Sequence, residues 1–532
     1  MKRKNWSMKL SAALAGALLV LAGCQPVSSV DVNKVLNGSF AVKSGEGRST
    51  VAFELTPDGS ATTTAEQKKA LELFGKIKLD ITEAKTQDAL HASLKGTLEY
   101  SKGKIPFHLE VSEMDYIVWL EGAKKPIVFK NNPAAFPQGA AGEVGLSVQL
   151  QKQIEDLAKK AVEKSPELGS FFVNNFPNPN KITAGPVTET VYGESLSLTK
   201  VHAELYGSEL VSIVKGFLTN VLADDAGLKA FIGTLYDLYA PLVKAVVEEQ
   251  SKSGGSDEMN AAIAPYLNNK TLAVEFLHTY IKSTLQKAVD QYDQTAASLT
   301  TSPTGEGLKP LLSDQHWFKV DLWVDKDYLP RKSAMEWNLT LSEGKGDGIK
   351  GIKVTSTSEN WNVNKPVTVS KVDVSKGVTE WEPSSRFTAG RLLAALEPNS
   401  TLYKLLKDDL HVTHKNIRLN AAEAGEVYGT QPYNDNGTVM VPVRFVTEQL
   451  DADVKWNAEA KKVTITDPLS GSIIELTIGS NQATVGGKTL TLEKPAQLVN
   501  SATYVPVRIV SEGMGADVKW EQDTQSVVIT RE

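Results

Sequence analysis

The chain lacks the features that several large functional classes require. No Lys/Arg-rich run occurs in its 532 residues, and the formal net charge is −6. Binding to nucleic-acid phosphates needs a concentrated basic face, so we expect no nucleic-acid partner. Gly-x-Ser-x-Gly, P-loop, dinucleotide-fingerprint and His-Glu-x-x-His motifs are absent, which leaves hydrolase, nucleotide-binding and zinc-protease functions without support.

Histidine is also scarce, with seven residues in the whole chain. The closest pair, His411 and His414, has the i,i+3 spacing of a helical metal site, but no third His or Cys lies near. We therefore predict no metal and no cofactor. The Asp and Glu residues are numerous but unclustered, so a catalytic carboxylate pair cannot be chosen. The expectation is a protein that is not an enzyme.

Cysteine occurs once, at Cys24, directly after a basic stretch and the apolar run 10–21. The basic stretch and short apolar run are typical of a secretory signal, and no later stretch is comparably apolar. Leu-Ala-Gly-Cys resembles the bacterial lipobox, in which the cysteine is acylated and becomes the mature N-terminus. We predict a signal peptide over residues 1–23, lipidation of Cys24, a tether over residues 24–34, and anchoring on the outer face of the cell membrane. The alternative is an ordinary signal peptide with a chance cysteine.

Beyond the tether, the composition is that of a folded protein, with 41% hydrophobic and 23% charged residues. Residues 35–130 alternate apolar and polar side chains, which indicates antiparallel strands. Helical spacing follows around residues 150–161, 228–246 and 272–289, and strands return at 317–324 and 335–354. This order predicts an α+β domain over residues 35–380, an antiparallel curved sheet with helical insertions.

The order of these elements, together with Val320-Asp-Leu-Trp-Val and Trp361-Asn-Val-Asn-Lys-Pro, resembles the LolA/LppX-like lipoprotein half-barrel. The resemblance implies a sheet with helices over an apolar cavity. It also implies the holding of a lipid or another apolar small molecule, with no catalytic residues.

Near the C-terminus, one segment is present twice. Residues 441–456 return as residues 505–520, offset by 64 positions, with 11 of 16 residues identical. Each copy begins Val-Pro-Val-Arg, where the proline suits the start of a helix, and ends Ala-Asp-Val-Lys-Trp. We predict two strand-helix-strand-strand units. The second helix stops at Gly515 and the first at Asp451, which can adopt the same positive-φ conformation at some cost. Residues 381–410 are predicted as a helical linker.

The repeated signature resembles the copper amine oxidase N-terminal-like, or stalk, domain, predicted here over residues 411–532. Oxidase chemistry belongs to a separate catalytic domain with a His-x-His pair and an Asn-Tyr-Asp/Glu tripeptide. Neither occurs in this chain. The resemblance therefore implies a non-catalytic surface module.

Six side chains of the repeat are candidates for partner binding. The i,i+4 pairs and the strand-ending tryptophans are Arg444, Glu448, Trp456, Arg508, Glu512 and Trp520. A charge pair is more often a helix staple, and such a tryptophan more often lies in the core. The leading hypothesis is a lipid-anchored surface protein that contacts a cell-wall polymer or envelope protein. The alternative is a carrier or sensor of an apolar ligand.

Overall fold

The computed structural model describes residues 27–28, 30–59, 63–113, 115–130, 147–252, 257–301, 308–341, 348–381, 388–423, 431–499 and 501–532. The chain clusters into two compact units. The first runs to residue 383 without residues 120–126 and 376–378; the second contains those two segments and residues 384–532. Each unit is described by itself.

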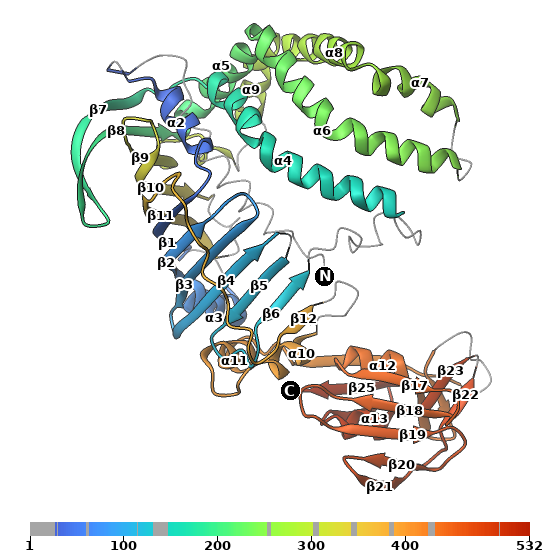
Figure 1. Cartoon of the computed structure of the whole chain (residues 1–532). Helices are drawn as coiled ribbons and strands as arrows, with labels where there is room; N and C mark the ends of the chain where they lie inside the picture. Colours follow the sequence, from blue (N-terminus) through green and yellow to red (C-terminus); the bar gives the residue numbers. More distant parts are fainter. Residues whose placement is uncertain are drawn as a thin grey trace. The chain divides into compact units, whose positions relative to one another are not determined.

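The first unit is built on one long curved sheet (Figure 1). Its strand order is β12-β6-β5-β4-β3-β2-β1-β11-β10-β9-β8-β7. The described pairings are antiparallel except β12 with β6. The strands are β1 (Gly45–Pro57), β2 (Lys76–Thr86), β3 (His91–Tyr100), β4 (Gly103–Ser112), β5 (Asp115–Leu120), β6 (Ile127–Lys130), β7 (Lys181–Val191), β8 (Glu194–Tyr206), β9 (Trp317–Val324), β10 (Pro330–Thr340), β11 (Ile349–Trp361) and β12 (Thr379–Trp381). The predicted α+β class and curved antiparallel sheet are confirmed.

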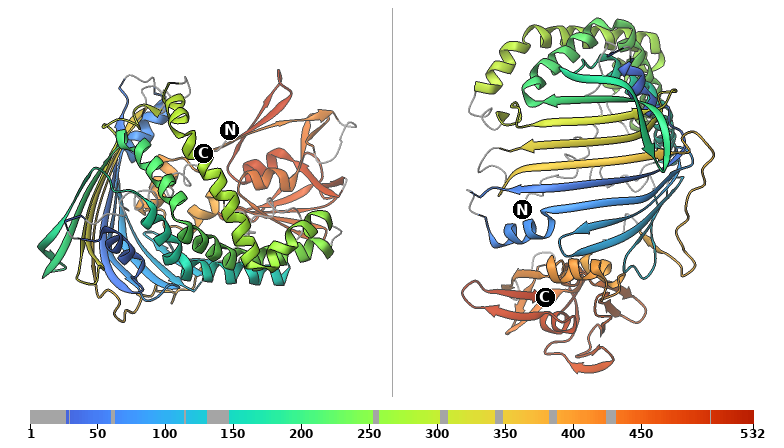
Figure 2. Two further views of the ribbon diagram at one scale, coloured as in Figure 1. Left: turned by 90° about the horizontal axis from the view of Figure 1, so that it is seen from above. Right: turned by 90° about the vertical axis from the view of Figure 1, so that its left-hand side faces the viewer.

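Helices lie on the hollow side of this sheet (Figure 2). They are α2 (Val32–Phe40), α4 (Val148–Asn175), α5 (Leu210–Ala223), α6 (Asp225–Lys252), α7 (Asp257–Asn268), α8 (Lys270–Asp290) and α9 (Tyr292–Thr301), while α3 (Ala65–Phe74) connects β1 to β2. Helices α2 and α4 pack on strands β8 to β10 through a core that includes Val35, Val173 and Val320. The helical layer has its own core, where the Phe171 and Phe231 rings stack at 4.5 Å.

Helix α2 corrects the predicted tether. We expected residues 24–34 to be an unstructured connection, but α2 begins at Val32. The Asp31 side chain caps it by accepting a hydrogen bond from the Lys34 backbone N–H at 3.1 Å. Val32, Val35 and Leu36 fall on one helical face and are buried. These three apolar residues span only about one and a half helical turns, a pattern too short to identify a helix from the sequence alone.

Helix α6 is the described helix that meets the length and composition of a membrane span. Residues Asp225–Ser251 form the one candidate membrane span among the described helices, with a mean hydropathy of 1.3 over the best window. Only 28% of that window is buried. The helix is long and apolar enough to span a membrane, but the core helix of a water-soluble protein also meets these two criteria.

The hollow face of strands β1 to β4 is apolar. Across neighbouring strands, Trp337 pairs with Val354, Val354 with Phe53, and Phe53 with Ile77. Cross-strand partners share a face, and Trp337 packs against the core under α2. Several apolar side chains on this face, such as Phe53, Leu79 and Phe107, are half-buried, whereas Val354 and Ile105 are buried.

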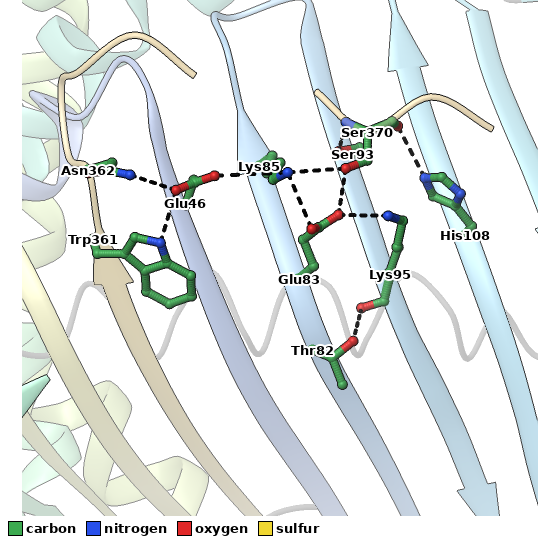
Figure 3. A network of polar contacts seen from close by, with 10 residues as sticks. All are labelled: Glu46, Thr82, Glu83, Lys85, Ser93, Lys95, His108, Trp361, Asn362 and Ser370. Atoms are coloured by element: carbon green, nitrogen blue, oxygen red, sulfur yellow. Dashed lines mark hydrogen bonds and ion pairs between the residues drawn. The ribbon is translucent and has the colours of Figure 1, made fainter. Parts of the chain in front are cut away.

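A segment without strand pairing, residues 362–375, crosses the opposite, polar face; we call it the strap. Ser370 is its main attachment (Figure 3): its backbone N–H donates to Ser93 Oγ at 2.9 Å, and its Oγ donates to Glu83 Oε1 at 2.6 Å. His108 Nε2 lies 3.1 Å from the Ser370 carbonyl oxygen. Beside it, Lys371 pairs with the buried Glu110 at 2.7 Å. A polar sheet face thus binds a strap of its own chain.

The strap should loosen in acid. Burial by itself would raise the pKa of Glu83, but hydrogen bonds from Ser370, Lys95 and Lys85 outweigh it and lower the pKa from 4.5 to about 2. A depressed carboxyl pKa stabilises above about pH 4.5, and the contribution is lost as pH falls through about 2. We expect Glu83→Gln to speed amide exchange of the strap about tenfold at pH 7. The variant should also lack the loss of protection in acid that we predict for the native protein. Hydrogen-exchange mass spectrometry at each pH measures the ratio.

The matched control for this prediction is Glu99→Gln, which removes the exposed partner of Lys104. It should leave exchange of the strap unchanged. A variant-to-native ratio that is the same at every pH would contradict the assignment to Glu83.

The second unit follows the internal repeat. Its strands are β13 (Lys415–Asn420), β14 (Ala422–Glu423), β15 (Tyr433–Asp435), β16 (Thr438–Pro442), β17 (Asp453–Asn457), β18 (Lys462–Thr466), β19 (Ile473–Thr477), β20 (Gln482–Val485), β21 (Lys488–Thr491), β22 (Gln497–Val499), β23 (Ala502–Pro506), β24 (Asp517–Glu521) and β25 (Ser526–Arg531). Its helices are α10 (Ala389–Ala394), α11 (Thr401–Lys404), the π-helix η5 (Leu405–Asp409), α12 (Val443–Gln449) and α13 (Val507–Gly513). The predicted strand-helix-strand-strand units are β16-α12-β17-β18 and β23-α13-β24-β25.

A local twofold axis relates the two copies. Val441 lies opposite Val505, flanked by Met440 opposite Pro506 and Pro442 opposite Tyr504. Val441 and Val505 are equivalent under the 64-residue offset, so the axis passes between them. Asp451 and Gly515 both adopt the predicted positive φ, at 65° and 74°.

The copies also interlock. Strand β13 pairs with β25 of the second copy, and β19 pairs with β18 of the first. Side chains of both copies meet in one core cluster, in which Val441, Leu450, Val505 and Met514 are at most 2% exposed. Each copy therefore depends on the other to complete its sheet.

Candidate functional site

The twofold axis produces two equivalent hollows in the second unit. Each is formed by the start of a helix and the tryptophan-bearing strand of one copy, and by a hairpin from the other copy. We call them the Trp456 pocket and the Trp520 pocket. Because each pocket draws on both copies, neither exists in a single repeat.

The Trp456 pocket has a volume of about 610 Å³. One side comes from the start of α12, the next from β17 and β18, and the third from the hairpin of β22 and β23. Its lining includes Arg444, Phe445, Glu448, Trp456, Leu498 and Thr503. Phe445, Trp456 and Leu498 are 46%, 44% and 57% exposed, so the pocket presents large apolar surfaces to solvent.

The Trp520 pocket is smaller, at about 410 Å³, and more polar. Its lining includes Asn434, Glu493, Arg508, Trp520, Gln522 and Gln525. The Trp520 indole N–H donates to Gln522 Oε1 at 2.8 Å. Asn434 is equivalent to Leu498 of the other pocket under the 64-residue offset. The two pockets share a framework but differ in the chemistry of their walls.

The structure corrects the expectation that the tryptophans lie in the core. Trp456 lies opposite Val463, and Trp520 opposite Val527, both of which are buried. The tryptophans thus point to the core-facing side of their strands. However, β17 and β24 are edge strands of their sheets, so one side of each ring has no neighbouring strand to cover it.

The arginine and glutamate of each copy pair on the helix surface, as their spacing indicates. Arg444 and Glu448 are 3.6 Å apart, and Arg508 and Glu512 are 2.8 Å apart. The arginine side chains are 64% and 54% exposed. Exposed i,i+4 pairs contribute only about 0.3–0.5 kcal/mol, so stability alone gives little reason for their presence in both copies.

Identity between the copies separates two groups of residues. Val443, Val446 and Ala452 equal their counterparts and are buried, which packing explains. Arg444, Lys455 and Trp456 also equal their counterparts but are exposed at both positions. Packing does not explain why these exposed side chains are the same in both copies. Of these, Arg444 and Trp456 line the Trp456 pocket, and their counterparts Arg508 and Trp520 line the Trp520 pocket.

Sequence reasoning missed Phe445 and Leu498. Phe445 is adjacent to Arg444, but its counterpart is Ile509, so it does not stand out in the repeat. Leu498 lies about 40 residues beyond Trp456 in the chain. Asn434 and Leu498 are also 64 positions apart, so the repeat could have shown that they occupy equivalent hairpins. Only the way in which the two copies cross brings Leu498 next to Trp456.

The remaining predicted features are placed as follows. Cys24 and the leader lie outside the described residues. His414 Nδ1 lies 3.3 Å from a Glu532 carboxylate oxygen. Throughout the described ranges, no three His, Cys, Asp or Glu side chains gather as a metal site.

Comparison with known proteins places the second unit. Residues 422–529 match the family model of the copper amine oxidase N-terminal domain. A protein of Brevibacillus choshinensis described as a protease inhibitor is 37% identical over 92 residues, which cover 17% of this chain and 27% of the relative. The chain thus spans about a quarter of that relative. No solved structure matches.

The family match concerns one part of the chain, residues 422–529. The family name refers to copper, but the potential metal ligands of this chain do not fit a copper site. No His-x-His occurs in the sequence, and the described His, Cys, Asp and Glu residues form no cluster of three. The resemblance of residues 35–380 to LolA/LppX-like half-barrels stays a prediction. Residues 422–529 of this chain, within the second unit, match the copper amine oxidase N-terminal domain.

Proposed function

We propose that the chain is a lipid-anchored surface protein whose stalk-type domain binds a component of the cell envelope. The membrane partner is the bilayer, reached through an acylated Cys24. The observation that carries the binding role is the pair of equivalent pockets, lined by exposed side chains that are identical in both copies. Exposed tryptophan and arginine are the residue types that most often dominate binding energy.

The lining of the Trp456 pocket agrees with a binding role. In the Trp456 pocket the lining carboxylate, Glu448, is engaged with Arg444 at 3.6 Å. The walls otherwise supply aromatic, aliphatic and hydroxyl surfaces. Such a lining can bind and orient a partner. The relative described as a protease inhibitor is also named for an action on another protein, which favours a macromolecular partner here.

Retention on envelope tests this proposal. The full chain carrying Cys24→Ser, which cannot be acylated, should sediment with envelope purified from the source cells. Adding Trp456→Ala and Trp520→Ala should weaken this retention at least about thirtyfold, because truncating a buried interface tryptophan typically costs 2 kcal/mol or more. Quantitative pelleting at increasing envelope concentration measures the change.

Trp119→Ala is the matched control, since Trp119 is 36% exposed and lies on β5 of the first unit. It should bind envelope as tightly as the parent. Equal retention of the double tryptophan variant would refute binding through these pockets.

A second candidate function is the holding of an apolar molecule on the hollow face of the long sheet. The specific observation is that Phe53, Leu79 and Phe107 on this face are half-buried, whereas apolar side chains under a packed layer would be buried. The first unit also has a depression of about 390 Å³, but its walls are largely hydroxyl and charged side chains, among them Arg48, Asp80 and Glu359. The apolar face is therefore the better candidate.

Mass spectrometry of gently extracted protein tests the carrier function. We expect a lipid or other apolar molecule to copurify, and Leu79→Lys to abolish it because burying an unpaired charge is costly. Lys78→Ala is the control, since neighbouring strand residues point to opposite faces. Extraction without any bound apolar molecule would count against the carrier function, as would equal loading of the Leu79→Lys variant.

A further inference from the structure

The Trp456 pocket lies between two edge strands. Among the described strands, β17 is the first of the order β17-β18-β19-β20-β21, and β22 is the last of the order β14-β15-β16-β23-β22. Trp456 belongs to β17 and Leu498 to β22, and both line the pocket. An edge strand presents backbone N–H and C=O groups that can pair with an added strand. The surroundings of this pocket therefore suit an extended polypeptide.

The walls of the pocket suit a large apolar side chain. Phe445, Trp456 and Leu498 approach from three different elements and are each more than 40% exposed. The equivalent positions around the Trp520 pocket are Ile509, Trp520 and Asn434. Trp520 and Asn434 line that pocket, whereas Ile509 packs against the core and does not. The same framework thus has an enlarged apolar surface in only one of its two versions. A sugar ring suits these walls less well, because it would stack on the indole and place its hydroxyls against the other two apolar walls.

The rim of the pocket favours a hydrogen-bond acceptor with negative charge. The Arg444 side chain is 64% exposed, and its contact with Glu448 is a long one at 3.6 Å. Within the described residues, the Trp456 indole N–H donates to no acceptor, whereas that of Trp520 is held by Gln522. A guanidinium and an indole N–H among the lining side chains of one pocket can together complement a carboxylate.

We infer that the Trp456 pocket binds an extended segment of a partner protein, which adds to β17 as a further strand. One large apolar side chain of this segment enters between Phe445, Trp456 and Leu498. A carboxylate two residues away lies on the same face of the added strand and pairs with Arg444. This inference rests on the proposed binding function and names the partner class for one of the two pockets.

Selection from a displayed library of random heptapeptides on the full-length protein tests the inference, after depletion on the Trp456→Ala variant. Enriched peptides should share a large apolar residue with Asp or Glu two positions away. A synthetic peptide of the enriched sequence should bind the native protein at least about thirtyfold more tightly than Trp456→Ala. Leu498→Asn, which introduces the residue of the Trp520 pocket at an exposed position, should weaken binding about tenfold. Trp520→Ala should not.

Backbone N-methylation of the peptide at alternate residues distinguishes strand addition from simple insertion of a side chain. Methylation in the register that faces β17 should abolish binding, while methylation in the other register should not. Equal effects in both registers would overturn the strand addition. The inference also fails if no peptide is enriched, if N-acetylglucosamine oligosaccharides bind instead with the same dependence on Trp456, or if Trp456→Ala dissociates a dimer of this chain.

These outcomes separate the inference from the proposed function. Envelope retention that depends on the tryptophans, combined with failure to select a peptide, would leave the binding function standing and remove the peptide partner. Loss of both would remove the proposed function as well.

Discussion

Replacing Asp467 by Ala should lower the free energy of unfolding of the second unit by about 3–5 kcal/mol, the usual effect of removing one partner of a buried ion pair. The Asp467 side chain is 0% exposed and that of Arg531 is 7% exposed, with the ionic atoms 2.6 Å apart. Removing the carboxylate leaves a buried guanidinium without its counter-charge. Within the described residues, the Arg531 guanidinium would retain only its hydrogen bond to the Leu450 carbonyl oxygen, at 2.8 Å.

The position of this pair explains why the effect should be large. Asp467 and Arg531 are equivalent under the 64-residue offset, so the pair joins the ends of the two repeat copies. Asp467 also accepts hydrogen bonds from the backbone N–H groups of Leu469 and Ser470 at 3.2 Å, which form the turn leading into β19. One substitution therefore weakens both the junction of the copies and this turn.

Denaturant titration followed by hydrogen exchange of peptides from residues 441–532 measures the second unit separately from the first. Glu475→Ala is the control, because its pair with Lys462 is about one-third exposed and such pairs are worth at most about 1 kcal/mol. Asp467→Ala combined with Arg531→Met should recover part of the loss, since the charge is then removed as well. A change below about 1 kcal/mol in the single variant would contradict the prediction.

Replacing Cys24 by Ser should move the protein completely from the membrane to the soluble fraction. One acyl chain binds a bilayer only marginally, and stable anchoring requires two signals. Under the proposed acylation, Cys24 carries two or three chains, so its loss would remove the whole anchor and not a part of it. The hydroxyl of serine cannot replace the thiol as acceptor. Fractionation of cells and medium, with immunodetection of the chain, measures the distribution.

Serine substitution of Ala22 controls for general disturbance of the leader, because it alters a neighbouring residue and keeps the cysteine. That variant should stay in the membrane fraction. Continued association of the Cys24→Ser protein with membranes after a high-pH carbonate wash would refute lipidation as the anchor.

Long-range pairing limited what could be foreseen for the first unit. Alternation in residues 77–111 and 317–341 correctly indicated strands, because half-buried strands show a period of two. The spacing of Leu228, Phe231 and Leu235 likewise indicated the helix that became α6. The strap has no such pattern, since an extended segment held by Glu83 and Ser93 depends on side chains about 280 residues away in the chain. Its attachment exists only once the sheet has formed.

In the second unit the sequence by itself determined the repeat, the short helices after Pro442 and Pro506, and the positive φ of Asp451 and Gly515. These features depend on neighbouring residues and on the internal copy, which a single sequence contains. The tertiary structure alone decided that Trp456 and Trp520 line open pockets. It did so because the copies cross around a twofold axis, which leaves their strands at sheet edges and brings Leu498 from one copy to Trp456 of the other.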